Sequence, residues 1–185
     1  MAAEACRIAD AVVISDYNYG TATPELFAAV KHATLDRGIP LVVDSRFRLA
    51  EFAGATSATP NQDEVDQLVE DGESVPQLEG LCRRLEFRSL LVTRGNNGML
   101  MVRPGQPAVE IPAVGSLDAV DVTGAGDTVT AAYSLGLACG FDEADAAQLA
   151  NHAGGLVVMK RGTAVVTAEE LAASIAAERP RAIPV

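Results

Sequence analysis

The run Asp121-Val122-Thr123-Gly124-Ala125-Gly126-Asp127 carries the residue types best suited to chemistry in this chain. Gly124, Ala125 and Gly126 have almost no side chain, so main-chain N–H groups there can close around an anion. The Ala-rich segment that follows predicts a helix, whose free first-turn N–H groups and positive dipole end favour an anion at the same place. We therefore expect these three residues to form an anion hole.

Asp127 falls in the first turn of that predicted helix, beside the expected anion. A carboxylate in this position can accept the proton of a hydroxyl that attacks a phosphoryl group. An Asp near its ordinary pKa of about 3.9 is ionised at neutral pH and needs no further tuning for this role. The alternative is structural, because helix starts favour acidic residues after a glycine turn. In isolation, a G-x-G-D sequence leaves both explanations open.

Composition excludes several other classes of function. The 185 residues suit one domain and allow a sizeable core. A formal net charge of −11 argues against a nucleic-acid-binding surface, which would be basic. No apolar run approaches the roughly 20 residues of a membrane helix. Three scattered cysteines without a C-x-x-C indicate reduced thiols, and we expect a cytoplasmic protein that binds neither membranes nor nucleic acids.

Alternating strands and helices must position these residues. Apolar runs predict strands at 11–14, 40–44, 58–59, 89–93, 99–102 and 108–111. Helical patterns cover 23–37, 62–69, 75–87, 126–139, 143–160 and 168–177, and Thr23 and Gly38 mark the start and end of the first. A strand soon after a helix implies parallel strands. We expect an α/β three-layer sandwich with a mostly parallel central sheet and ligands at the carboxyl ends of its strands.

Asn61 and Glu64 are a second candidate pair. Their spacing of three places both side chains on one face of a helical turn. Amide and carboxylate oxygens suit Mg²⁺, which proteins usually bind through its waters. The same spacing fits a capping box with Asn61 at the helix start, and spacing alone favours that structural explanation. The two explanations are compatible, since a capped helix can also present a carboxylate.

The run from Asp121 to Asp127 resembles the C-terminal signature of the ribokinase-like (PfkB) carbohydrate and nucleoside kinases. Other segments resemble motifs of that family and occur in its order. They are Ser15-Asp16-Tyr17, Thr59-Pro60-Asn61-Gln62-Asp63-Glu64, Leu91-Val92-Thr93-Arg94 with Gly98-Met99, and 150–158 with Lys160 and Gly162-Thr163. The likeness covers most of the chain. Within the family, the chain looks most like the kinases of heptose 7-phosphate in lipopolysaccharide-precursor synthesis.

The resemblance implies a ribokinase-like fold and ATP-dependent phosphotransfer to a hydroxyl of a sugar or sugar phosphate. It assigns the role of catalytic base to Asp127 and the anion hole to the turn before it. It places Asn61 and Glu64 in the Mg²⁺–phosphate region, where they would contact the nucleotide and hold Mg²⁺ through water. ATP and Mg²⁺ are therefore the expected cofactors.

The same resemblance implies further nucleotide contacts. Thr93, Arg94 and Gly95 end a predicted strand near the nucleotide, and Asn151 matches a position that lines its base and ribose. For Arg94, an ordinary surface arginine on a turn is an equal alternative.

Asp121 and Thr123 match positions that hold a monovalent cation such as K⁺ in several family members. A turn-forming acid is an equal alternative for Asp121. Asp16 and Asp44 follow apolar strands and either face the active site or form turns.

The chain departs from the heptose-kinase pattern at Asn18-Tyr19-Gly20 and at Ser45-Arg46-Phe47, where that subgroup carries lysines. Because Lys and Arg bind phosphate differently, the resemblance does not specify which sugar is the substrate.

The resemblance also implies that residues 1–185 are the C-terminal nucleotide-binding and catalytic portion of a kinase domain. The missing N-terminal part would hold several strands, a β-structured lid and most sugar-binding residues. A sheet that ends abruptly exposes an edge and an apolar face, so we expect a dimer or a partner that covers this edge. Two alternatives are a catalytically silent nucleotide-binding fragment and one half of a split kinase.

Overall fold

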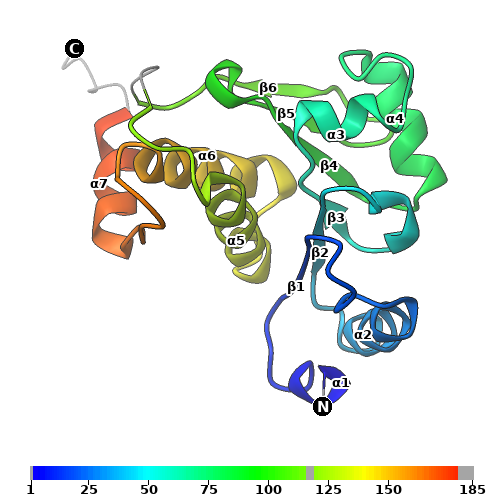
Figure 1. Ribbon diagram of the computed structural model, residues 1–185. Coiled ribbons are helices and arrows are strands. Elements are labelled where there is room, and N and C mark those ends of the chain that lie inside the picture. The colour runs from blue at the N-terminus through cyan, green and yellow to red at the C-terminus, as the bar shows by residue number, and fades with distance from the viewer. Residues whose placement is uncertain (1, 116–118, 179–185) are drawn as a thin grey trace, which may run out of the picture.

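The computed structural model describes residues 2–115 and 119–178. Its centre is a six-stranded sheet in which the spatial order of the strands follows the chain (Figure 1). The strands are β1 (Val12–Asp16), β2 (Leu41–Ser45), β3 (Ser57–Ala58), β4 (Ser89–Thr93), β5 (Met99–Val102) and β6 (Val109–Ile111). β1 to β4 pair in parallel, whereas β4, β5 and β6 pair antiparallel. The expected α/β class is confirmed.

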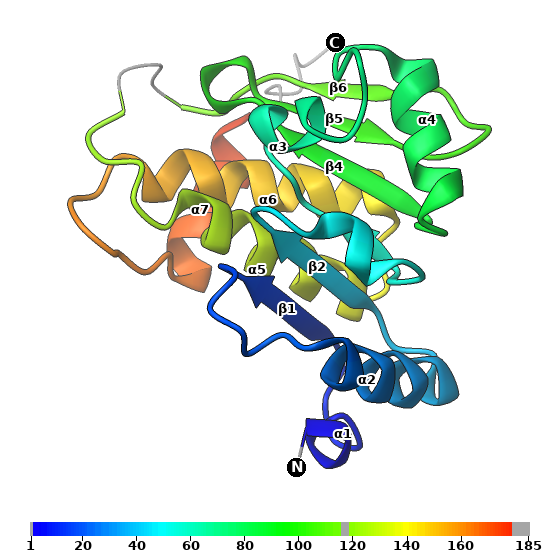
Figure 2. The same ribbon diagram turned by 45° about the vertical axis from the view of Figure 1, so that its right-hand side comes forward.

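Helices cover both faces of this sheet. They are α1 (Ala2–Ala5), α2 (Pro24–Arg37), α3 (Gln62–Asp66), α4 (Val75–Arg84), α5 (Ala125–Ala138), α6 (Glu143–Val157) and α7 (Ala168–Glu178), with 3-10 turns η1 (Leu49–Phe52) and η2 (Gly95–Asn97). Figures 1 and 2 show α2 and α4 on one side of the sheet and α5 and α6 on the other, with α7 outside α6. The predicted three-layer sandwich is therefore confirmed.

Two apolar cores lie on the two faces of the sheet. Along β4, Leu90 and Val92 join the core beneath α2 and α4, whereas Leu91 joins the core beneath α5 and α6. Strands that are buried on both faces read as continuous apolar runs, which is why these segments were recognisable in the sequence.

Local signals account for α2. The Thr23 side chain accepts a hydrogen bond from the N–H of Leu26, and Gly38 ends the helix in the left-handed region at φ 65°. Several other helices end earlier than predicted. α4 stops at Arg84 because the chain turns at Glu86, whose φ is 57°, before it enters β4. α6 stops at Val157, and the Val158 carbonyl instead accepts the N–H groups of 120 and 121.

β1 forms an open edge of the sheet. Among the described residues, only β2 pairs with it. Val13 is 41% exposed and Ser15 is also exposed, while Ile14 is buried in the core beneath α2 and Asp16 is buried against Arg48. One face and one edge of β1 are thus uncovered.

No helix in the described part of the chain is both long enough and apolar enough to cross a membrane.

Tyr133 joins α5 to the sheet. Its side chain is fully buried, and its hydroxyl lies 3.1 Å from Ser57 Oγ and 2.9 Å from Ser89 Oγ. Burial raises the pKa of Tyr133 to about 12, so the phenol stays neutral and hydrogen-bonded. The helix is thereby fixed over β3 and β4.

Tyr133→Phe should lower the free energy of unfolding by about 1 kcal/mol, since one net hydrogen bond is lost while the two serines remain paired with each other. Urea unfolding followed by circular dichroism measures this difference. Tyr19→Phe is the matched control, because Tyr19 is 90% exposed and should leave the midpoint unchanged. Equal midpoints for the two variants would contradict the role given to the Tyr133 hydroxyl.

Candidate active site

An open pocket of about 400 Å³ lies at the carboxyl ends of the parallel strands, against the start of α5. Most predicted site residues line it: Asn61, Glu64, Thr93, Gly95, Gly124, Ala125, Gly126 and Asp127. Six residues outside that set also line it, namely Asp16, Tyr17, Asp44, Arg46, Thr59 and Val122. Segments far apart in the chain therefore meet at the edge of the sheet where ligands of α/β folds bind.

A second pocket of about 190 Å³ adjoins the first on the other side of the α5 start. Thr93, Gly95 and Gly126 line both pockets. The smaller pocket is largely apolar, and Met99 and Val158 contribute to its wall. The site thus has a polar compartment and an apolar compartment separated by one helix terminus.

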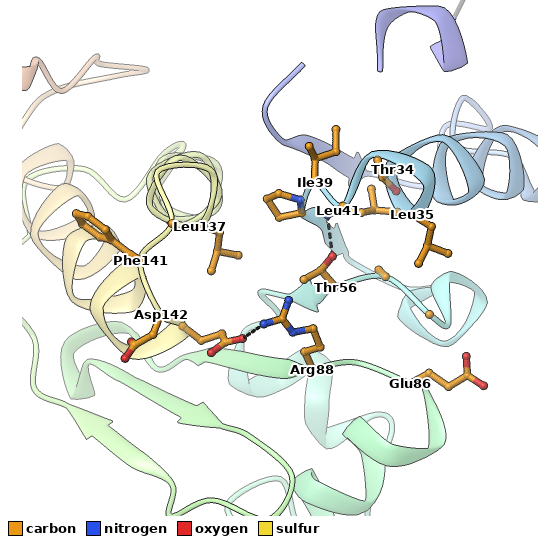
Figure 3. A pocket seen from close by; sticks show the side chains of 16 residues that line it. Thr34, Leu35, Ile39, Leu41, Thr56, Glu86, Arg88, Leu137, Phe141 and Asp142 are labelled. Carbon is orange, nitrogen blue, oxygen red and sulfur yellow. Dashed lines mark hydrogen bonds and ion pairs between the residues drawn. The ribbon is translucent and has the colours of Figure 1, made fainter. Parts of the chain in front are cut away.

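A larger pocket of about 600 Å³ lies at the opposite end of the strands, and no predicted site residue lines it (Figure 3). Figure 3 shows Leu137 and Phe141 facing Leu35 and Ile39 across its opening. Arg88 in this pocket forms an ion pair with Glu143 at 3.1 Å. Pocket volume alone therefore does not identify the pocket that holds the predicted site residues.

The start of α5 is shaped by Gly124, which caps the helix in the left-handed region at φ 76°. The N–H of Ala125 donates to Val122 O at 3.1 Å, so this part of the predicted anion hole is already committed within the protein. The first-turn N–H groups of Gly126 and Asp127 lack intrahelical acceptors, as at any helix start. The anion hole stays a prediction, and these two amides are its best donors.

Asp127 meets the end of β1. The Tyr17 hydroxyl donates to the Asp127 carboxylate, at 2.9 Å from Oδ1 and 3.0 Å from Oδ2. Burial, the hydrogen bond to Asp127 and the nearby charges of Asp127 and Asp44 raise the pKa of Tyr17. The phenol therefore stays protonated at neutral pH and acts as a donor. The sequence motif Ser15-Asp16-Tyr17 was the available signal for this residue.

Asp16, the preceding residue, has a structural role. Arg48 donates to Oδ1 from Nη2 at 2.9 Å and to Oδ2 from Nε at 3.1 Å, and Ser45 Oγ donates to Oδ2 at 2.9 Å. Burial acts to raise the pKa of Asp16, but the hydrogen bonds from Arg48 and Ser45 outweigh it and the pKa falls below its ordinary value. Asp16 therefore anchors the strand end and also lines the main pocket, so the structure supports both explanations.

Asp44, at the same edge of the sheet, faces the pocket. Burial first, and then the charges of Glu64 and Asp127, raise the pKa of Asp44 to about 7. Four carboxylates thus line one pocket, and the charges of Glu64 and Asp127 repel that of Asp44. Such a set of oxygen donors suits a hard divalent cation, which would offset the repulsion.

Asn61 and Glu64 form the capping box expected from their spacing. The Glu64 N–H donates to Asn61 Oδ1 at 2.9 Å, and the Asn61 N–H donates to Glu64 Oε2 at 3.0 Å. Burial nevertheless raises the pKa of Glu64, and the side chain lines the pocket. The structural explanation is confirmed, and the capped helix also presents its carboxylate to the site. The role of this pair at Mg²⁺ stays a prediction.

The remaining predicted contacts fall at the rim and in the smaller pocket. Arg94 lies outside the main pocket, where its Nε donates to Gln62 Oε1 at 3.1 Å. Thr93 pairs with Asn61 in an isolated bridge; Thr93 lines both pockets, whereas Asn61 lines the main pocket and not the smaller one. Asn151 is buried in the wall of the smaller pocket, and its Nδ2 donates to Pro112 O at 2.8 Å.

Gly155 is a residue that the sequence analysis did not single out. A Cβ atom there would lie 2.2 Å from Val114 O, so only glycine allows the segment before α5 to pack on α6. Two adjacent glycines inside a helix, Gly154 and Gly155, were the available signal, because they cost helix stability without a packing reason.

Asp121 ties the signature turn to the segment after α6. Its Oδ1 accepts the N–H of Thr123 and its Oδ2 accepts the N–H of Gly162, both at 2.9 Å. These hydrogen bonds, from Thr123 first, lower the pKa of Asp121. Asp121 and Thr123 lie next to the main pocket rather than in its lining. The monovalent-cation site stays a prediction.

Within the described residues, no group of three or more His, Cys, Asp or Glu side chains is arranged as a metal site. Mg²⁺ does not require such a cage, because it keeps several waters and binds through one or two carboxylates plus phosphate. The half-buried carboxylates of Asp44 and Glu64 therefore fit Mg²⁺ held through water.

The fold matches solved α/β kinases. The ribokinase of Giardia lamblia superposes with a TM-score of 0.81 at 17% identity, over 95% of this chain and 61% of that chain. The phosphofructokinase-2 of Escherichia coli, solved in complex with potassium, gives a TM-score of 0.78 at 20% identity, over 95% of this chain and 60% of that chain. These neighbours show a ribokinase-like fold.

The chain belongs to the pfkB family of carbohydrate kinases, whose pattern matches residues 2–170. The bifunctional protein HldE of Citrifermentans bemidjiense is 42% identical over 172 residues, which are 90% of this chain and 35% of that protein. HldE of Caulobacter vibrioides is also 42% identical over 172 residues, with 89% of this chain and 35% of that protein covered. This chain thus spans about a third of the length of these relatives.

Asp44→Asn should change how stability depends on pH. In the folded protein the pKa of Asp44 rises from 3.8 to about 7, so the native state holds a proton that the unfolded chain has lost. The stability contributed by this proton is present below about pH 4 and is lost as the pH rises to about 7. In Asp44→Asn we expect this loss to be absent.

Urea unfolding across this pH range, without divalent cations, measures the effect. Asp36→Asn is the control, because this exposed carboxylate on α2 pairs with His32 at the surface. The assignment of the raised pKa to Asp44 is wrong if parent and Asp44→Asn give parallel stability curves.

Proposed function

We propose that this chain is the nucleotide-binding and catalytic part of an ATP-dependent kinase that phosphorylates a hydroxyl of a sugar or sugar phosphate. The observation that carries the proposal is the position of Asp127. Its carboxylate stands in the first turn of α5, beside the helix-start amides and inside the pocket at the strand ends. A base and an anion site thus share one helix turn, as phosphoryl transfer to a hydroxyl requires.

In this mechanism Asp127 accepts the proton of the acceptor hydroxyl as its oxygen attacks the γ-phosphorus of ATP, and ADP leaves. The N–H groups of Gly126 and Asp127 and the helix dipole stabilise the negative charge on the transferred phosphoryl group. The apolar compartment walled by Asn151 takes the adenine base. The two compartments meet at Gly126, so ATP spans them with its phosphates at the helix start. The ribokinase of Arabidopsis thaliana, 24% identical and with a TM-score of 0.74, was solved with ribose and ATP, ligands of the same two classes.

Two cations belong to this proposal. Glu64 with Asn61, and Asp44 beside them, would hold Mg²⁺ through water, and Mg²⁺ supplies charge neutralisation for the phosphates. Asp121 and Thr123 would hold K⁺. The potassium complex of Escherichia coli phosphofructokinase-2 supports a monovalent cation in this fold.

The similarity to HldE supports a phosphorylated acceptor, and heptose 7-phosphate is the first candidate. Arg46 lines the pocket near Glu64 and can pair with a phosphate on the acceptor. It stands close to where the heptose-kinase pattern carries a lysine. We place the reaction in the cytoplasm, where ATP and sugar phosphates are available.

The open edge of β1 supports a second possibility. Val13 is exposed and, among the described residues, nothing pairs with the outer side of β1. Since the solved relatives have chains of which this one covers 53% to 61%, further structure or a second copy would cover this edge. The chain would then bind nucleotide alone and transfer phosphate only with that partner, as one half of a kinase.

Asp127→Asn should abolish phosphate transfer while ATP binding is kept, because the variant loses the proton acceptor but not the amides. We expect turnover to fall about 10²–10⁴-fold. ADP release with a panel of sugars and sugar phosphates, heptose 7-phosphate included, measures turnover, and calorimetry measures ATP affinity. Asp36→Asn is the control. Transfer at the parent rate by Asp127→Asn would falsify the base assignment.

Gly126→Val should weaken ATP binding at least tenfold with little effect on folding. A Cβ atom at Gly126 meets nothing within 4 Å, so it would project into the pocket space that the phosphates occupy. Gly80→Val is the matched control, because Gly80 also lies in a helix with open space around its Cβ position and far from the site. Equal ATP affinities for the two variants would place the nucleotide elsewhere.

A further inference from the structure

The hydrogen bond between Tyr17 and Asp127 is the least expected contact of the site. One phenolic hydroxyl lies within hydrogen-bonding distance of both carboxylate oxygens, at 2.9 and 3.0 Å. The two residues are 110 positions apart in the chain, so the contact exists only because α5 docks at the end of β1. Asp127 therefore already accepts a hydrogen bond from a hydroxyl supplied by the protein.

The segment that carries Tyr17 is fixed at both ends. The Asn18 N–H donates to Asp16 Oδ1 at 3.0 Å, with Asn18 in the left-handed region at φ 60°. Arg48 donates hydrogen bonds to the Asp16 carboxylate and also donates from Nη2 to Ala22 O at 3.0 Å. The backbone after β1 is thus held by buried ionic contacts, which aims the Tyr17 side chain at α5.

The Tyr17 ring itself is not locked into the core. The side chain is 46% exposed and lines the open pocket. Rotation of the ring away from Asp127 would break one hydrogen bond and would expose no buried apolar cluster. The contact combines a fixed backbone with a movable side chain.

We propose that Tyr17 is a positioning residue that occupies the hydrogen-bonding positions of Asp127 until an acceptor hydroxyl displaces it. This inference rests on the proposed function, in which Asp127 is the base. A general base must lie within hydrogen-bonding reach of the proton that it removes, and the phenol holds that place in the structure. The acceptor O–H then replaces the tyrosine O–H, so the base keeps one donor throughout.

The consequence is protection of ATP from water. In hydrolysis a water oxygen would form a bond to the γ-phosphorus, the bond from that phosphorus to the bridging oxygen would break, and Asp127 would take the water proton as ADP leaves. While Tyr17 stands against both carboxylate oxygens, a water molecule must displace the phenol to donate its proton from that side. A bound sugar hydroxyl has additional contacts that compensate for displacing the phenol, whereas a water molecule does not.

The first test concerns the contact itself. The chain has three tyrosines and no tryptophan, so the Tyr19→Phe background leaves only Tyr17 and Tyr133 to titrate by tyrosinate absorbance. Asp44 also faces Tyr17 and stays in place in both proteins compared. Adding Asp127→Asn to this background should move the Tyr17 transition to lower pH while leaving that of Tyr133 unchanged. An unmoved Tyr17 transition overturns the proposal.

The second test concerns its function in the whole chain. Tyr17→Phe should raise acceptor-independent ATP hydrolysis about tenfold and lower the KM for the accepted sugar, while Tyr19→Phe leaves both unchanged. The proposal is overturned if sugar-dependent ADP release is retained but Tyr17→Phe hydrolyses ATP no faster than the parent. If neither transfer nor hydrolysis occurs in any protein, the proposed function fails as well, and the displacement role falls with it.

Discussion

The docking of α5 across the parallel strands is the constraint on which the site depends. Two buried polar contacts fix this helix: Tyr133 on the serines of β3 and β4, and Thr130 Oγ1 at 2.8 Å from Thr59 Oγ1. Thr130 and Tyr133 are three residues apart and share one helix face, so rotation or sliding of α5 would leave buried hydroxyls without partners. Asp127 lies three residues before Thr130, in the first turn of the same helix. Its side chain is therefore held at the carboxyl ends of the strands.

Local chemistry explains which features could be predicted from the sequence. The Thr23 cap, the Gly38 end and the capping box at Asn61 each depend on neighbours within a few residues. The buried strands are visible in the sequence as apolar runs. The contacts that complete the site cross the fold instead. Tyr17 reaches Asp127, and Asp121 holds the turn at Gly162, over distances in the chain that no local pattern encodes. Close backbone approach, as at Gly155, is equally invisible until the packing partner is known.

The placement of Asp16 and Asp44 shows why strand ends are ambiguous in a sequence. Both carboxylates stand at corresponding edges of neighbouring parallel strands, since Asp16 pairs in register with Ser45 and Ser15 with Asp44. The one-residue offset turns them to opposite faces of the sheet. Both aspartates line the pocket, but Asp16 pairs with Arg48, whereas Asp44 meets the repelling charges of Glu64 and Asp127. Register, which only the folded sheet defines, separates the two roles.

The charges of the pocket decide how it can bind a nucleotide. Asp44, Glu64 and Asp127 face it in a chain of net charge −11, and a triphosphate adds more negative charge. Two unit charges 5 Å apart repel by about 3 kcal/mol at an effective dielectric constant of 20. A helix start offers at most about 2 kcal/mol to an anion. In the proposed function, the amides of α5 would orient the phosphates without overcoming the repulsion, and a cation would have to neutralise the carboxylates when ATP enters. Under this proposal the cation would set the nucleotide affinity of the pocket, and α5 would set the geometry of the phosphates.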